Sequence, residues 1–94
     1  MTKPTGRPPR ALPPVPLYVG GRTFVAWDRA PHNRVTLHNL SEDDVCFLLH
    51  KLGQYVEGTH PYATFRAYVA EVTGVFEDRP GHALILLEGV KTHA

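Results

Sequence analysis

The stretch SEDDVCFLLHKLGQYVEG, residues 41–58, carries the strongest structural signal in the chain. Ser41 is a favourable helix N-cap, and the three acidic residues that follow it stabilise the positive end of a helix dipole. Apolar residues then recur at the three- and four-residue spacing of one buried helix face: Val45, Leu48, Leu49, Leu52, Tyr55 and Val56. Gly53 interrupts the pattern at a cost of about 1 kcal/mol relative to alanine. The pattern predicts an amphipathic helix over residues 42–57.

The residues before this helix have the composition of β-strands. Two adjacent glycines, Gly20 and Gly21, separate apolar runs at 17–19 and 22–27, which is the signal of a hairpin with a two-residue turn. Turn-forming residues follow, and the alternation of apolar and polar side chains over 34–38 predicts a third strand.

Two structures fit residues 62–76. Five apolar side chains in this segment fall on one helical stripe, whereas its β-branched residues and Gly74 oppose a helix. Turn residues at 77–81 and a buried-strand run at 83–88 favour a hairpin of 65–76 with 83–88. A helix over 61–73 is the alternative.

The predicted fold class is therefore α+β. We expect a small antiparallel sheet in the order β-β-β-α-β-β, with one amphipathic helix packed on one face, because this arrangement buries both apolar surfaces. This compact domain spans residues 17–94. An extended arm, residues 1–16, precedes it and contains six of the nine prolines. Proline fixes φ and lacks a backbone donor, so the arm is expected to be polyproline II rather than helix or central strand.

The arm contains the string RALPPVP, residues 10–16, which resembles the ligand motif of Src-homology-3 domains. Three residues per polyproline turn place two apolar-proline pairs on one edge, where they can fill aromatic grooves, while Arg10 pairs with an acid. A groove on another kind of partner and a plain solubilising tail are the alternatives. The residues predicted to contact a partner are Arg7, Arg10, Leu12, Pro13, Val15 and Pro16.

A second contact is predicted on the helix. On a helical wheel, Phe47 lies opposite Val45 and beside Lys51. A phenylalanine on a polar helix face is typical of an interface, although single exposed apolar residues are also common. Phe47 and Lys51 are therefore added to the predicted partner-binding residues.

Charge divides the chain into two parts. Residues 1–34 have a balance of +5 and residues 35–94 a balance of −4. This polarity suits an oriented protein contact, including a head-to-tail homo-oligomer in which the arm meets the acidic start of the helix. Nucleic-acid binding is a less favoured alternative, in which three arginines track a backbone: Arg22, Arg29 and Arg34.

Catalytic and metal-binding patterns are weak. Cys46 and His50 are four residues apart, but zinc needs two further ligands and no paired Cys/His motif is present. His32, with arginines on either side, is the best candidate for a small histidine-dependent nuclease. We predict no catalytic residue, no metal and no cofactor, and keep the nuclease as an alternative.

The 94 residues contain no apolar run longer than five and no secretory signal, so no membrane association is expected. One cysteine fits a reducing compartment. Ten valines to one isoleucine and seven arginines to three lysines indicate a GC-rich bacterial or phage genome. The sequence therefore predicts a non-enzymatic assembly or adaptor subunit, cytoplasmic or in a virion, that docks on a larger complex through its arm and one domain face.

Overall fold

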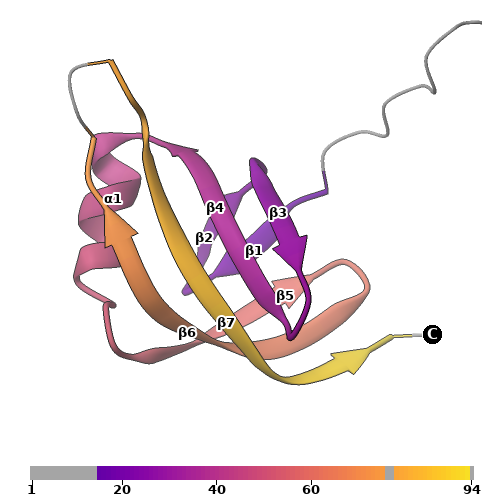
Figure 1. Cartoon of the computed structure of the whole chain (residues 1–94). Helices are drawn as coiled ribbons and strands as arrows, with labels where there is room; N and C mark the ends of the chain where they lie inside the picture. Colours follow the sequence, from indigo (N-terminus) through magenta and orange to yellow (C-terminus); the bar gives the residue numbers. More distant parts are fainter. Residues whose placement is uncertain (1–14, 76–77, 94) are drawn as a thin grey trace, which may run out of the picture.

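The computed structural model describes residues 15–75 and 78–93. Within these residues the chain forms seven strands and one helix (Figure 1). In chain order they are β1 (Leu17–Val19), β2 (Arg22–Phe24), β3 (Trp27–Ala30), β4 (Arg34–Leu40), α1 (Glu42–Leu49), β5 (Tyr55–His60), β6 (Ala63–Thr73) and β7 (Gly81–Thr92). Four residues of the predicted arm contact, Arg7, Arg10, Leu12 and Pro13, lie outside the described residues.

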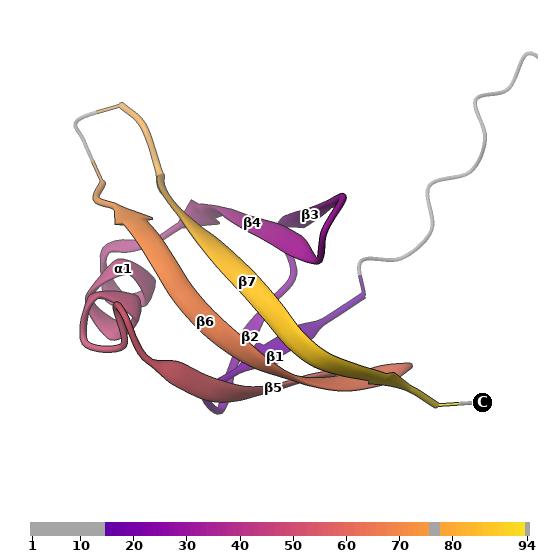
Figure 2. The ribbon, with the colours of Figure 1, turned by 60° about the horizontal axis from the view of Figure 1, so that its bottom comes forward.

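The strands form one antiparallel sheet in the order β2-β1-β5-β6-β7-β4-β3. This sheet curls into a half-barrel, so that β4 and β7 lie on one side of the core and β1 and β5 on the other (Figures 1 and 2). The α+β class is therefore correct in outline, with the sheet dominating. The core is a single apolar cluster inside the curve: Leu17, Val19, Phe24, Val35, Leu37, Leu40, Val45, Leu48, Phe65, Ala67, Val69, Ala83, Ile85 and Leu87.

The predicted element order, β-β-β-α-β-β, is wrong in two places. Residues 22–27 do not form one strand, because β2 ends at Phe24 and β3 begins at Trp27. The link between them carries the chain from one edge of the sheet to the other, where the Ala26 carbonyl accepts a hydrogen bond from the His38 amide at 2.9 Å. The second difference is β5, which occupies residues assigned to the helix.

Helix α1 ends at Leu49, so the predicted helix over 42–57 is eight residues too long. Its start is as expected, since the Ser41 hydroxyl accepts a hydrogen bond from the Asp44 amide at 3.2 Å. The chain leaves the helix through a turn in which Gly53 has a φ of 76°, a conformation that glycine adopts without strain. Gly53 then donates its amide to the Val69 carbonyl at 2.8 Å, which directs the chain into β5 beside β6.

The short helix also packs differently from the prediction. It lies at one end of the half-barrel and buries only Val45 and Leu48, instead of covering a sheet face with a long stripe (Figure 1). Leu49 is 50% exposed, and Leu52 and Tyr55 are exposed too, so these predicted core residues are not core. A Cβ at Gly81 would overlap the Val45 side chain, so glycine allows β7 to approach the helix.

The C-terminal hairpin is confirmed. Strands β6 and β7 pair from Ala63 opposite Thr92 to Thr73 opposite His82, with two register shifts. The alternative helix over 61–73 is therefore excluded. The β-branched residues prevail over the helical stripe because they fit the inner and outer faces of a pleated strand.

Candidate functional site

An apolar cleft opens at the end of the half-barrel away from α1. It holds about 50 Å³, well below the ~300–1,000 Å³ of small-molecule sites. A cleft of this size accepts a side chain of a peptide rather than a metabolite. Six strands supply its lining: β1, β3, β4, β5, β6 and β7. The lining residues are Leu17, Trp27, Arg29, Val35, His60, Ala63, Phe65, Leu87 and Val90.

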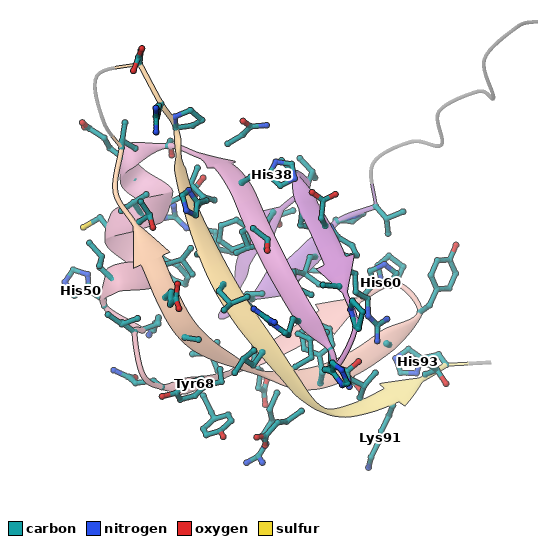
Figure 3. All side chains as sticks on the ribbon, in the orientation of Figure 1. His38, His50, His60, Tyr68, Lys91 and His93 are labelled. Carbon is teal, nitrogen blue, oxygen red and sulfur yellow. The ribbon has the colours of Figure 1, made fainter. Side chains whose placement is uncertain are left out.

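Three aromatic rings extend from this cleft to the surface, and we call Trp27, His60 and Tyr62 the aromatic ledge. Trp27 meets His60 edge to face with ring centroids 5.7 Å apart, and His60 lies 5.4 Å from Tyr62. The Tyr62 amide donates to His60 Nδ1 at 3.2 Å, which fixes the imidazole at the end of β5 (Figure 3). Tyr62 itself is 65% exposed, so the ledge offers an open aromatic face.

The root of the predicted arm is attached to this ledge. The indole nitrogen of Trp27 donates a hydrogen bond to the Val15 carbonyl at 2.8 Å. Val15 and Pro16, both predicted to contact a partner, are half-buried there. Val15, the first residue that the structure describes, therefore lies beside the cleft.

The surroundings of His60 favour the neutral form of its imidazole. Burial lowers the pKa of the His60 imidazole, and the positive charge of Arg29 lowers it further. Because Nδ1 accepts the Tyr62 amide, the neutral ring carries its proton on Nε2. Arg29 donates a hydrogen bond to the Asn33 side chain in the β3–β4 turn, and this contact orients the Arg29 guanidinium.

The predicted contact around Phe47 has a different environment from the one expected. Phe47 is half-buried and packs against the core, so its assignment to an exposed polar face is wrong. A Cβ on Gly20 would stand 3.0 Å from the ring, and the cations of Arg22 and Lys51 lie 4.8 and 5.8 Å from its centroid. The Phe47 ring therefore has contacts within its own chain and needs no partner to cover it. Its role in partner binding, and that of Lys51, stays a prediction.

The three arginines of the nucleic-acid alternative are divided between two places. Arg22 lies against α1, where its guanidinium donates to Asp44 at 2.9 Å and Asp43 at 3.2 Å. These hydrogen bonds raise the pKa of Arg22. Arg29 and Arg34 lie on the β3–β4 hairpin, with Arg34 opposite Ala30. Of the three arginines, Arg29 lines the cleft beside the aromatic ledge.

The histidines do not converge on a reactive centre among the described residues. Cys46 Sγ lies 4.0 Å from His50 Nδ1, but that nitrogen is 2.8 Å from the Cys46 carbonyl and serves as its donor. Residues 15–75 and 78–93 contain no group of three potential metal ligands. His32 lies exposed in the β3–β4 turn, with a φ of 64°. His38 Nε2 lies 3.2 Å from Asp28 Oδ2 across two paired strands.

Sequence reasoning did not identify the ledge. Tyr62 lay within the alternative helix over 61–73, and Trp27 within a single apolar run over 22–27. Their proximity depends on the pairing of β3 at one sheet edge and on the curvature that carries this edge towards β5. The proline between His60 and Tyr62 was the available signal, because it marks a turn as readily as a helix start.

In the part of the chain that the structure describes, no helix has the length and apolar character to cross a bilayer. Comparison with models of protein families, with curated proteins and with solved structures found no match to this chain.

Proposed function

We propose that this protein is a non-enzymatic assembly or adaptor subunit that docks on a larger protein complex through its N-terminal arm and the aromatic cleft. The observation that carries the proposal is the hydrogen bond from the Trp27 indole to the Val15 carbonyl, since it joins the root of the arm to the cleft. Arm and cleft then act as one continuous docking surface. A phage or bacterial particle is the setting that the composition favours.

The chemistry of the ledge supports protein binding. Tryptophan and tyrosine dominate the energetic centres of protein interfaces, because they bury large apolar areas and keep a polar group for orientation. Tyr62 presents such a ring to solvent. The cleft beneath the ledge is lined by aliphatic side chains from Leu17, Val35 and Leu87, so it favours an apolar side chain of a partner.

A non-enzymatic role is supported by the titratable groups of the cleft. Among the described residues that line it, these groups are Arg29 and His60. General acid–base catalysis at neutral pH usually employs two groups with complementary protonation states. An arginine side chain does not exchange a proton at neutral pH, so among these lining residues His60 alone can act as an acid or a base.

Nucleic-acid binding is the second candidate, favoured by one observation. Arg29 lines the same cleft as the ledge rings, and single-stranded nucleic acids bind to cationic grooves with exposed aromatic faces. Binding of generic DNA or RNA that weakens steeply with salt would favour this candidate over protein docking.

A capture experiment from the native source tests the main proposal. The full chain, Tyr62→Ser and the matched control Tyr55→Ser are immobilised, since Tyr55 is also exposed but lies on β5 with its hydroxyl bonded to Glu88. We expect one protein partner that Tyr55→Ser retains and Tyr62→Ser loses, and that binds again when purified. Equal capture by all three chains, or capture of nucleic acid alone, contradicts protein docking at the ledge.

A further inference from the structure

We infer that the aromatic ledge is a receptor for polyproline II, and that its occupant is the segment Leu12-Pro13-Pro14 of the same chain. The inference rests on the proposed function in taking the cleft as a docking site, and it names the class of ligand and the resident copy. Residues 12–14 lie outside the described part of the chain and immediately precede Val15.

The first support is the type of hydrogen bond at the root of the arm. A polyproline II segment has no internal hydrogen bonds, so its carbonyls are free to accept from a receptor. Receptors for such segments combine aromatic grooves with donors to these carbonyls. Trp27 supplies this donor to Val15, a residue that is followed by Pro16 and preceded by two prolines.

The second support is reach. Three residues of polyproline II rise about 9 Å. The ring centroids of the ledge follow one another at 5.7 and 5.4 Å from Trp27 through His60 to Tyr62. From the point where Val15 is held, residues 12–14 therefore have the length to pass His60 and to bring the Leu12 side chain within reach of Tyr62.

The third support is the identity of the chain that supplies the segment. Val15 of the same molecule occupies the Trp27 donor, so the adjoining residues are present at the ledge at a high effective concentration. An arm from a second copy would have to compete against this local concentration. The intramolecular occupant is accordingly the favoured one.

The character of the ledge also selects which part of the arm binds. Arg29 places a positive charge in the cleft, next to an aliphatic floor that includes Leu17 and Val90. An uncharged segment such as Leu12-Pro13-Pro14 fits this environment, whereas Arg7 and Arg10 are repelled from it. Those two arginines then remain outside the cleft, where an acidic partner can reach them.

Nuclear magnetic resonance on the isotope-labelled full chain tests the inference. We expect Overhauser contacts from the rings of His60 and Tyr62 to Leu12, Pro13 and Pro14, and we expect their relative intensity to survive dilution. They should be lost in the double variant Pro13→Gly/Pro14→Gly and in Tyr62→Ser. They should persist in two matched controls, Tyr55→Ser on the outer face of β5 and Pro4→Gly near the start of the arm.

Two outcomes overturn the inference. One is an arm whose Leu12, Pro13 and Pro14 resonances match those of a free peptide of residues 1–14, with no contact to the ledge. The other is contact that occurs between differently labelled copies, which identifies the arm of a second chain as the occupant. Neither outcome decides partner docking, because capture through Tyr62 is measured separately. If the full chain captures no protein partner, or if Tyr62→Ser captures it equally, while the intramolecular contacts are present, the proposed function alone is contradicted.

Discussion

The guanidinium of Arg22 lies 2.9 Å from a carboxylate oxygen of Asp44, which joins β2 to the first turn of α1. The same group reaches Asp43 at 3.2 Å and covers the ring of Phe47. Sequence reasoning had assigned this acidic turn to a head-to-tail contact with the arm of another copy. Two of its three carboxylates have a partner within the chain, so a contact with Arg7 and Arg10 would have to compete with Arg22.

We expect Arg22→Gln to lower the urea midpoint at low salt and to reduce the effect of salt on that midpoint. Salt screens partly exposed ion pairs, so the wild-type chain should lose part of this stabilisation in 1 M NaCl, where the Debye length is about 3 Å. Arg34→Gln is the matched control, since Arg34 is an exposed arginine at the β3–β4 turn. Identical salt dependence in the two variants would show that the Arg22 contacts contribute no stability.

Two adjacent leucines should differ sharply in their contribution to stability. Leu48 is fully buried, so Leu48→Ala should lower the free energy of unfolding by about 2–5 kcal/mol. Leu49 is half exposed, so Leu49→Ala should stay within about 0.5 kcal/mol of the wild-type chain. Chemical denaturation of both variants measures the difference. An equal loss of unfolding free energy in the two variants would show that Leu49 is also buried, as the predicted helix stripe requires.

Gly58→Ala should disturb the cleft from beneath. A Cβ at this position in β5 would overlap the ring of Phe65, which lines the cleft. The ring has to move, and we expect a loss of about 1–3 kcal/mol, typical of an overpacked core. Gly21→Ala is a poor control because of its positive φ, whereas Gly74 has open space beside it and no such strain. Gly74→Ala should therefore leave stability near that of the wild-type chain. Chemical denaturation of both variants tests this, and an equal stability of Gly58→Ala and Gly74→Ala would contradict the overlap with Phe65.

Stability should fall as the pH drops below about 6.5, the ordinary pKa of histidine. Burial and Arg29 lower the pKa of His60 in the folded chain, so the unfolded chain takes up its proton first. The contribution of neutral His60 is present above pH 6.5 and is lost as the pH falls through the lowered folded pKa. His60→Gln should flatten this part of the profile, and His93→Gln, at an exposed position, should not. Parallel profiles for the three chains would contradict a lowered pKa for His60 in the folded chain.

The elements that the sequence predicted well are those set by local chemistry. Ser41 begins the helix because its hydroxyl satisfies a free amide, and the Gly20-Gly21 turn forms because both residues have positive φ. The end of the helix could not be predicted in this way. Apolar residues continue at helical spacing past Leu49. The helix nevertheless ends there, because every residue of β5, Tyr55–His60, pairs with a residue of β6. The spacing of apolar residues in one segment does not show which distant segment that segment will pair with.

The candidate site depends on long-range pairing even more. Trp27 and His60 are brought together by curvature of a sheet whose outermost strands are β2 and β3, and neither residue lies in a motif. The arm residues Val15 and Pro16 were predicted from a local motif, and the structure places them beside these rings. The role of Val15 and Pro16 in partner binding stays a prediction, and the aromatic rings beside Val15 could be found only from the fold.

The strand order also determines when each strand can pair during synthesis of the chain. Strand β4 pairs with β7, with Arg34 opposite Leu86, and β1 pairs with β5, so β1 and β4 each gain a second neighbour late. At ~5–20 residues per second, a ribosome needs roughly 3–10 s to add the residues between these two positions. During that interval the arm and the β1–β2 hairpin emerge before the sheet can close. A partner that recognises the arm can therefore meet the nascent chain before the half-barrel exists.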